Sequence, residues 1–294
     1  MRLTLIVSTY NQTEALGKVL RGVQRQTRLP DEVVIADDGS GPATRQLITD
    51  WLGHVPMPVR HLWHPDDGFR KTVILNEAVA AAKGEYLVLL DGDCVPEARF
   101  IEDHARLAED GFWVQGRRCF VKEPFTKSFE AATTPILWWM LRGRISGAAK
   151  GLRLRLPIVQ RNMKQRGILG CNMAFWREDL AAVNGFDEDY TGWGIGEDSD
   201  LGTRLYSLGR PRKFVHAHAI IYHLNHPMMP RDHFAASQAR LAETLRTRKI
   251  CCERGLNLHK PGSASTPSPK RKPDGAACQG ARRPYNAASD NRRS

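Results

Sequence analysis

Short apolar runs alternate with amphipathic segments over the first hundred residues, and this alternation restricts the fold more than any other feature. A continuous apolar run of about five residues is typical of a strand that is buried on both faces. Such strands, separated by helices, form parallel sheets that helices cover on both sides. The sequence therefore predicts an α/β fold with a Rossmann-like, mostly parallel central sheet flanked by helices. The expected strands are 3–8, 32–36, 59–63, 85–90, 169–175 and 213–222, and the expected helices are 13–26, 43–51, 72–82, 201–208 and 234–248.

Polar residues stand where three of these strands end. Ser8 ends the first strand and Tyr10 follows it, Asp38 follows the second, and Asp91 and Asp93 follow the fourth. Ligands bind beyond the carboxyl ends of the strands in sheets of this class, so these side chains predict a binding site at that edge. Polar turns are the alternative explanation, because Asp, Ser and Gly are common turn residues.

The spacing of Asp91 and Asp93 suits a divalent cation. Two carboxylates one residue apart at a strand end can share one ion, and hard oxygen ligands favour Mn²⁺ or Mg²⁺. An isolated Asp-x-Asp is common in polar turns, but the preceding apolar strand and the acidic residues after the second strand favour the metal site.

Four histidines, at 216, 218, 223 and 226, are further candidate ligands. If residues 215–223 form one straight strand, His216 and His218 face one side and His223 faces the other. His223, at the strand end, is the first candidate for a metal ligand, and His226 is the second. A structural zinc cluster is a poor explanation because no cysteine is nearby.

The most distinctive segment runs from Gly192 to Asp200 and combines three glycines, one tryptophan and three carboxylates. Glycines such as Gly194 let the backbone approach a ligand closely, and Trp193 offers a flat face for a sugar ring. A carboxylate beside that face, Glu197 or Asp198, can act as a general base. The alternative is a helix N-terminus, which acidic residues stabilise. The two interpretations are compatible with each other. A base at a helix N-terminus is expected to have a low pKa.

Positive charge is distributed unevenly along the chain, whose formal net charge is +11. Residues 131–177 contain nine Lys or Arg and no Asp or Glu, and residues 261–294 contain seven against two. Such asymmetry predicts an anionic partner. Within 129–166, an apolar and aromatic stretch around Trp138 runs into basic residues, which favours an anionic membrane surface. A core helix followed by a solvated loop is the alternative.

A specific nucleic-acid partner is not expected, since the basic stretches lack a helix-turn-helix, a zinc finger or a ribonucleoprotein motif. No apolar run is long enough for a spanning helix, and no secretory signal stands at the N-terminus. The six cysteines form no Cys-x-x-Cys pair, so we expect reduced thiols in a cytoplasmic protein, peripheral on the inner face of the cell membrane. The expected organisation is a nucleotide-sugar-binding half (1–110), an acceptor-binding and catalytic half (111–258) and a disordered basic tail (259–294).

Taken together, the motifs resemble the family 2 glycosyltransferases, which have the GT-A fold. The resemblance rests on Val7-Ser-Thr-Tyr-Asn11, Val34-Ile-Ala-Asp-Asp-Gly-Ser40, Leu89-Leu-Asp-Gly-Asp93, Gly170-Cys-Asn-Met-Ala-Phe175, Asn184-Gly-Phe-Asp187 and Gly192–Leu201. The last two also look like animal β-1,4-galactosyltransferases and bacterial chondroitin polymerases.

The resemblance implies an inverting transfer from a nucleotide-diphosphate sugar, most often a UDP-sugar, to a hydroxyl of a glycan or lipid-linked acceptor. The expected setting is cell-surface polysaccharide or lipopolysaccharide synthesis. It implies nucleoside contacts for Ser8, Tyr10 and Asp38, ribose or phosphate contact for Asp91, metal binding by Asp93 and His223, and a general base at Asp198 assisted by Glu197. Trp193, Gly194 and Asp200 would line or support the donor and acceptor pocket. Independently of the resemblance, the basic turn at Arg70 is expected to face phosphate, and solvated surface is the equal alternative. A non-catalytic polyanion- or nucleic-acid-binding protein on the same scaffold is the alternative.

Overall fold

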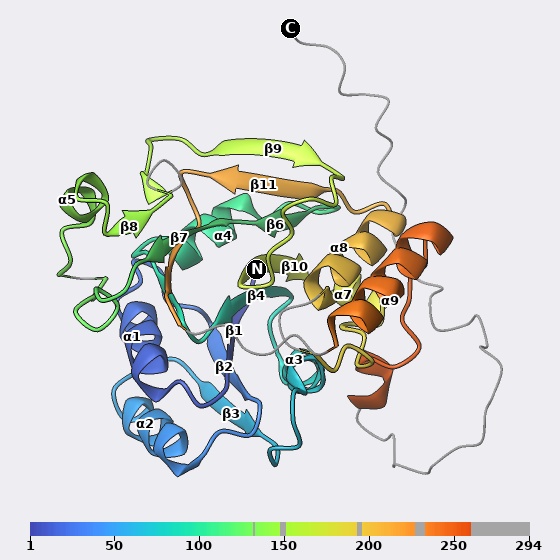
Figure 1. Cartoon of the computed structure of the whole chain (residues 1–294), viewed down its shortest axis with the longest axis horizontal. Helices are drawn as coiled ribbons and strands as arrows, with labels where there is room; N and C mark the ends of the chain where they lie inside the picture. The colour runs from blue at the N-terminus through green and yellow to red at the C-terminus, as the bar shows by residue number, and fades with distance from the viewer. Residues whose placement is uncertain (132, 148–150, 193–195, 227–232, 260–294) are drawn as a thin grey trace, which may run out of the picture.

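The computed structural model describes residues 1–131, 133–147, 151–192, 196–226 and 233–259 (Figure 1). Residues 260–294, nearly all of the predicted basic tail, lie outside the described residues, as do Trp193 and Gly194. The strands are β1 Leu3–Thr9, β2 Glu32–Asp37, β3 Val59–Trp63, β4 Tyr86–Asp91, β5 Cys94–Pro96, β6 Trp113–Gln115, β7 Arg117–Val121, β8 Ile145–Ser146, β9 Ile158–Asn162, β10 Asn172–Trp176, β11 Arg212–His216 and β12 Ile220–Leu224. The helices are α1 Thr13–Gln24, α2 Pro42–Leu52, α3 Lys71–Ala81, α4 Phe100–Leu107, α5 Ile136–Leu141, α7 Arg177–Ala182, α8 Glu197–Ser207 and α9 Phe234–Thr247, followed by the 3₁₀ helix η1 Leu256–His259.

The large sheet has eight described strands in the order β3-β2-β1-β4-β10-β6-β11-β9. Strands β1 to β4 are parallel to one another, as predicted. Strand β10 runs antiparallel between β4 and β6, and β9 runs antiparallel to β11. The sheet is therefore parallel in its amino-terminal half and mixed in its carboxyl-terminal half.

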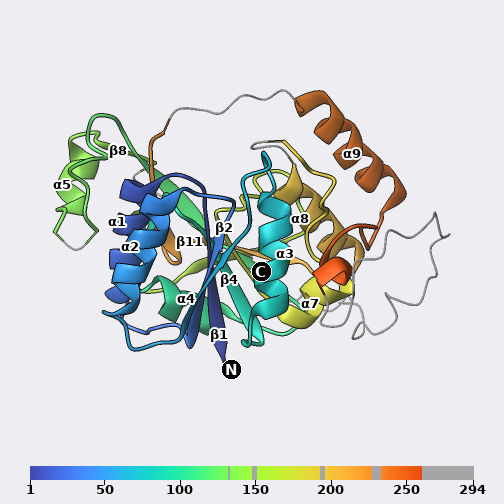
Figure 2. The ribbon, with the colours of Figure 1, turned by 90° about the horizontal axis from the view of Figure 1, so that it is seen from below.

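Alternate residues of the central strands are buried in two hydrophobic cores, one on each face of the large sheet. In β1, Leu5 and Val7 belong to one core and Ile6 belongs to the other. Helices α1, α2 and α4 contribute to the first core, and α3, α7 and α8 contribute to the second. Figure 2 shows α1 and α2 on one side of the strands, and α3 and α8 on the other. This burial explains why the strands read as continuous apolar runs.

A smaller sheet, in the order β5-β12-β7-β8, stands beside the large one. The prediction of a single strand over 213–222 is wrong, because the chain breaks at Ala217 and Ala219, which have φ of 64° and 49°. Strand β11 belongs to the large sheet and β12 to the small one. This change of sheet carries His223 on β12 to the strand β5 that follows Asp93, with Cys94 as its register partner.

Four described cysteines, Cys94, Cys119, Cys171 and Cys252, carry free thiols. Among the described residues, no helix combines the length and the apolar character that crossing a membrane would require.

Candidate active site

The carboxyl ends of β1 and β4 are joined through Asp91. The Ser8 hydroxyl donates to Asp91 Oδ1 at 2.8 Å, and Lys71 Nζ lies 2.8 Å from the same oxygen. These three side chains line one small pocket together with Glu197 and Asp198, which begin α8. Residues from four distant parts of the sequence thus meet at the edge of the sheet where parallel-strand folds bind ligands.

The carboxylate of Asp198 is held in place by neighbouring N–H groups. The backbone N–H of Gly170 donates to Oδ2 at 2.8 Å, and the backbone N–H of Ser199 donates to Oδ1 at 2.6 Å. Two oriented donors fix the direction of the carboxylate, which is a property required of a general base. The side chain is half-buried, so an acceptor hydroxyl can reach it.

The structure contradicts the expectation that a base at this position has a low pKa. Burial raises the pKa of Asp198, although the N–H groups of Gly170 and Ser199 and the charge of Lys71 oppose it. Burial, and then the charge of Asp198, raise the pKa of Glu197 to about 7. Desolvation of the pair therefore outweighs the favourable field of the helix N-terminus. The result is a pair of carboxylates whose pKa values both lie above their usual values, which is a property often found at catalytic sites.

Lys71 is a candidate site residue that the sequence reasoning missed, because it assigned the phosphate-facing role in this basic turn to Arg70. The Arg70 side chain points to Asp67, 3.8 Å away at the surface, and its backbone N–H donates to Asp38 Oδ2 at 3.1 Å. Burial lowers the pKa of Lys71, but the charges of Asp91 and Glu197 outweigh this and raise it above its usual value. The ammonium group is therefore a fixed positive charge among the carboxylates. Arg70 and Lys71 are neighbours in the sequence, and the residue at which α3 begins determines which of the two side chains faces the pocket.

Asp93 meets the two predicted histidines just beyond this pocket. Its Oδ2 atom lies 3.1 Å from Nε2 of His226 and 3.8 Å from Nε2 of His223. Burial works to raise the pKa of Asp93, but the hydrogen bond from His226 and the charge at His223 hold it below its ordinary value. His223 Nδ1 is buried and has no hydrogen-bond partner among the described residues. A carboxylate and imidazole nitrogens form a donor set that fits a divalent cation.

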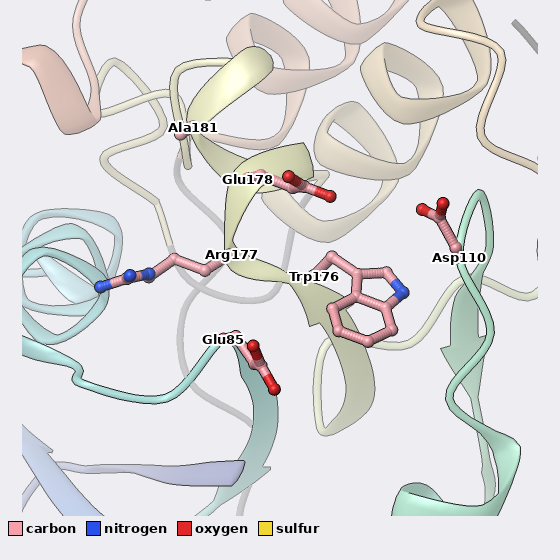
Figure 3. A pocket seen from close by; sticks show the side chains of 6 residues that line it. All are labelled: Glu85, Asp110, Trp176, Arg177, Glu178 and Ala181. Carbon is pink, nitrogen blue, oxygen red and sulfur yellow. The ribbon is translucent and has the colours of Figure 1, made fainter. Parts of the chain in front are cut away.

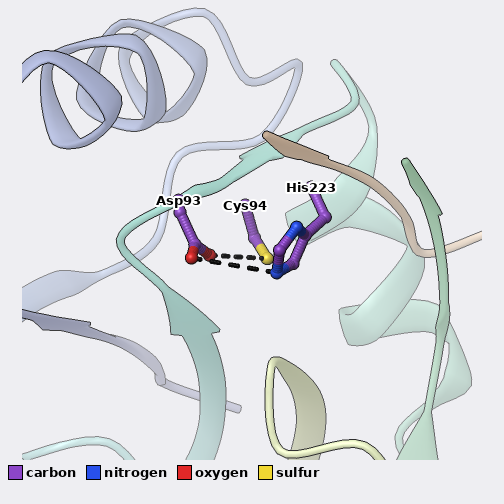
Figure 4. Close-up of side chains that lie close together, drawn as sticks. All are labelled: Asp93, Cys94 and His223. Atoms are coloured by element: carbon purple, nitrogen blue, oxygen red, sulfur yellow. Dashed lines mark hydrogen bonds and ion pairs between the residues drawn. The ribbon is translucent and has the colours of Figure 1, made fainter. Parts of the chain in front are cut away.

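Cys94 adds a thiol to this cluster. Asp93, Cys94 and His223 each offer one ligand atom, and these atoms all lie within 4.8 Å of one another (Figure 4). The Cys94 thiol donates to Asp93 Oδ1 at 3.2 Å. The sequence reasoning overlooked Cys94 because it searched for cysteines near the histidines in sequence, whereas β12 brings His223 to β5 in space.

Asp38 and Tyr10 line the loops after β2 and β1. Asp38 accepts a hydrogen bond from His64 Nε2 at 2.7 Å, and burial raises the pKa of Asp38 despite this partner. Tyr10 is exposed, and its hydroxyl donates to Asp66 at 2.9 Å. Gly39 follows Asp38 with φ of 91°, and a Cβ there would lie 2.6 Å from Cα of Asp66, so the loop requires glycine.

Asp200 does not face the pocket. It is 1% exposed, and it accepts hydrogen bonds from Arg204 Nε at 2.7 Å and from Thr244 on α9 at 2.7 Å. Arg204 is itself fully buried, and the hydrogen bond from Thr244 to Asp200 joins α9 to α8 inside the protein. The other predicted pocket residues, Trp193 and Gly194, lie outside the described residues.

A second, larger pocket of about 340 Å³ lies at the opposite edge of the sheet (Figure 3). It is lined by Glu85, Asp110, Trp176, Arg177, Glu178 and Ala181. Glu85 precedes β4, whereas Asp91 ends it. This pocket is therefore remote from the carboxyl ends of the parallel strands, and the predicted site residues do not line it.

Several curated proteins are similar in sequence. The chain is 26% identical to the chondroitin synthase of Escherichia coli over 243 residues, which cover 76% of this chain and 35% of that protein. It is 28% identical to the validoxylamine A glucosyltransferase of Streptomyces hygroscopicus subsp. limoneus, over 71% of this chain and 49% of that protein. It is 27% identical to the hyaluronan synthase of Pasteurella multocida, over 70% of this chain and 23% of that protein. The chain thus spans half or less of the length of these relatives.

Solved structures share the fold. The S. aureus protein TarS 1-349 in complex with UDP has a TM-score of 0.61 at 15% identity, covering 88% of this chain and 68% of that chain. The mannosyltransferase PcManGT from Pyrobaculum calidifontis, in complex with GDP-Man and Mn²⁺, has a TM-score of 0.52 at 22% identity, covering 84% of this chain and 62% of that chain. The predicted GT-A fold is confirmed.

Two family models match the chain. The model described as the N-terminal domain of galactosyltransferase matches residues 152–227. The model of glycosyl transferase family 2 matches residues 4–163, which is more than half of the chain. With the fold and the carboxylate-lined site at the strand ends, this match shows that the chain belongs to glycosyltransferase family 2.

Proposed function

We propose that this protein transfers a sugar from a nucleoside-diphosphate sugar, a UDP-sugar in the first instance, to a hydroxyl group of a glycan or a lipid-linked acceptor. The observation that carries this proposal is the meeting of Asp91, Lys71 and Asp198 in one pocket, with Asp93 and His223 close by. Such a site combines a proton acceptor with positive charge beside it, as sugar transfer with a diphosphate leaving group requires.

The donor assignment is supported by related structures. TarS 1-349 has been solved with UDP and with UDP-GlcNAc, and PcManGT has been solved with GDP-Man and Mn²⁺. By analogy, Ser8, Tyr10 and Asp38 would contact the nucleoside, and Asp91 would contact the ribose or a phosphate. The Arg70 guanidinium lies 3.8 Å from Asp67 at the surface, so it would have to turn away from that carboxylate to contact a phosphate oxygen.

Asp93 and His223 would hold a divalent cation, Mn²⁺ or Mg²⁺, with His226 as a further partner of Asp93. When bound, such an ion neutralises the negative charge that develops on the departing diphosphate. The donor set fits this role, since Asp93 and His223 belong to a cluster whose potential ligand atoms all lie within 4.8 Å of one another.

Asp198 accepts the proton of the acceptor hydroxyl as that oxygen attacks the anomeric carbon from the face opposite the diphosphate. One displacement of this kind inverts the configuration at that carbon, and the protein forms no covalent bond to the sugar. Glu197 adjoins the base and takes part in its electrostatic environment. Lys71 keeps both carboxylates more acidic than burial alone would leave them.

The setting that we propose is cell-surface polysaccharide or lipopolysaccharide synthesis in the cytoplasm, with peripheral contact at the inner face of the cell membrane. The chondroitin and hyaluronan synthases among the relatives favour a polysaccharide product.

The surface around α5 is suited to such contact. We define the α5 surface as Leu137, Trp138, Leu141, Arg142 and Arg144. Leu137 is 62% exposed and Leu141 is 79% exposed, while the guanidinium groups of Arg142 and Arg144 lie 4.5 and 4.7 Å from the Trp138 ring. Exposed apolar side chains beside arginines match the acyl boundary and the anionic headgroups of a bilayer.

The function is tested with the purified full chain, Mn²⁺ and a panel of nucleoside-diphosphate sugars, by measuring release of the nucleoside diphosphate. Release from one donor in wild type, with Asp93→Ala inactive, is the expected result. Donor binding is measured in parallel by calorimetry, because hydrolysis without an acceptor can be slow. If no donor is hydrolysed and none binds with metal, the transferase proposal fails and polyanion binding becomes the better explanation.

A further inference from the structure

The cation cluster contains sulfur as well as oxygen and nitrogen. Among the described residues, Asp93, Cys94 and His223 are the three whose potential ligand atoms lie within 4.8 Å of one another. We propose that Cys94 is a third protein ligand of the cation, so that this site binds thiophilic divalent ions such as Co²⁺ and Zn²⁺, tolerates Mn²⁺ and discriminates against Mg²⁺. The inference rests on the proposed metal-dependent transfer at the same site and narrows the choice of ion.

The separations between the potential ligand atoms agree with those around a single ion. Metal–ligand bonds of about 2.0–2.3 Å in a tetrahedral arrangement place the ligand atoms roughly 3.3–3.7 Å apart. The Cys94 sulfur lies 3.2 Å from Asp93 Oδ1, and His223 Nε2 lies 3.8 Å from Asp93 Oδ2. The two separations involve different oxygens of the same carboxylate, and the three potential ligand atoms all lie within 4.8 Å of one another. These separations are compatible with one ion bound by all three groups.

The backbone holds Cys94 and His223 in a fixed relationship. The two residues are register partners in the antiparallel pair of β5 and β12, so they face the same side of the small sheet. Their relative position is set by strand pairing and does not depend on a loop. A ligand pair set by strand register is preorganised, which favours binding over a pair that must be ordered by the ion.

The donor set determines which ions are preferred. Thiolate and imidazole ligands favour Zn²⁺ and other transition metals, whereas Mg²⁺ prefers oxygen ligands in octahedral geometry. Three protein ligands leave a position open for a diphosphate oxygen, which is the pattern of catalytic rather than structural sites. On binding, the metal–sulfur bond replaces the S–H bond of Cys94, and the thiol proton passes to the solvent.

Cys171 provides a matched control. It is a buried free thiol that neighbours Cys94, but it does not belong to the three-residue cluster. Replacement of Cys94 or Cys171 by serine removes one sulfur atom at nearly constant volume. A difference between the two variants therefore reports metal–sulfur bonding rather than packing.

The test uses Co²⁺ added to the full-length protein, without donor or acceptor, and absorption spectroscopy. Ligand-field bands in the visible report that Co²⁺ is bound, and a thiolate-to-cobalt charge-transfer band in the near ultraviolet reports a sulfur ligand. We expect both in wild type and in Cys171→Ser, only the ligand-field bands in Cys94→Ser, and neither in Asp93→Ala. Calorimetry should show Zn²⁺ affinity weakened at least about tenfold in Cys94→Ser, with Mg²⁺ affinity nearly unchanged.

The spectrum of the wild-type protein decides the question even if a variant fails to fold. Ligand-field bands without the charge-transfer band overturn the role of Cys94 and leave the oxygen and nitrogen site intact. A charge-transfer band that persists in Cys94→Ser assigns the sulfur elsewhere and also overturns it. Absence of both bands in wild type overturns the metal site itself, and with it this part of the proposed function.

Discussion

Lys71 and Asp91 form an ion pair of 2.8 Å in which the first residue of α3 meets the last residue of β4. The same carboxylate oxygen accepts a hydrogen bond from the Ser8 hydroxyl on β1. One oxygen thus joins two adjacent strands to a helix on one face of the sheet. The ammonium group is thereby held beside the carboxylates that begin α8.

The charge of Lys71 predicts a shift in the pH dependence of transfer. Burial raises the pKa of Asp198 and of Glu197, and Lys71 opposes that rise. In Lys71→Met the opposing charge is gone, so the base stays protonated to a higher pH. The acidic limb of the kcat/KM profile should therefore move to higher pH, and Lys71→Arg should restore part of the shift. Lys127→Met, on the exposed surface, is the control, and an unchanged limb in Lys71→Met would show that Lys71 does not act on the base.

Asp198 and Asp200 lie two residues apart in α8, and their substitutions should have opposite consequences. Asp198→Asn removes the proposed base, so we expect a loss in kcat of about 10²–10⁴-fold with little change in stability. Asp200→Asn leaves the buried guanidinium of Arg204 without its charged partner, which should cost about 3–5 kcal/mol in the free energy of unfolding. Urea unfolding and steady-state kinetics on both variants separate the effects. A stable, active Asp198→Asn protein would exclude Asp198 as the base.

The raised pKa of Glu197 predicts that this side chain destabilises the fold at alkaline pH. The folded protein holds a proton on Glu197 up to about pH 7, whereas the unfolded chain loses it near the usual value for glutamate. The folded state therefore binds more protons between these values, and stability falls as pH rises through the window. Glu197→Gln should raise the free energy of unfolding by about 1–3 kcal/mol at pH 8 and change it little near pH 4. Thermal melts of both proteins across this range measure the difference, and an equal effect at both pH values would contradict the assignment.

The α5 surface predicts binding to anionic membranes. Leu137→Ser combined with Leu141→Ser removes two exposed apolar side chains, so folding should be unaffected and recovery with floated anionic vesicles should fall severalfold. Leu245→Ser, an exposed leucine on α9, is the matched control and should float like wild type. Equal recovery of the wild type with neutral and anionic vesicles would refute the membrane contact.

The amino-terminal half was predictable because one physical rule governs it. Residues such as Ile6 and Val7 are buried on opposite faces, so the central strands are apolar along most of their length and visible in the sequence. The expected strand 59–63 coincides with β3, and the carboxyl ends of β1, β2 and β4 hold the residues expected there.

The rest depends on features that leave no local signal. Ala217 and Ala219 adopt positive φ without glycine, so the break that separates β11 from β12 could not be read from the sequence. The Arg70 side chain points to the surface and the Lys71 side chain points into the pocket, and this difference depends on where α3 begins. The raised pKa of Asp198 reflects burial by residues distant in the sequence, which outweighs the local helix field.

Because the chain changes sheet between β11 and β12, the site is built from residues of two segments that are far apart in the sequence. Asp93 lies in the expected half 1–110, whereas His223 and Asp198 lie in the half 111–258. A polypeptide nicked near residue 110 would thus carry the proposed cation-binding carboxylate on one fragment and the proposed imidazole ligand and base on the other. If the proposed function is right, neither fragment alone holds a complete site, so transfer depends on the two lengths of chain staying associated.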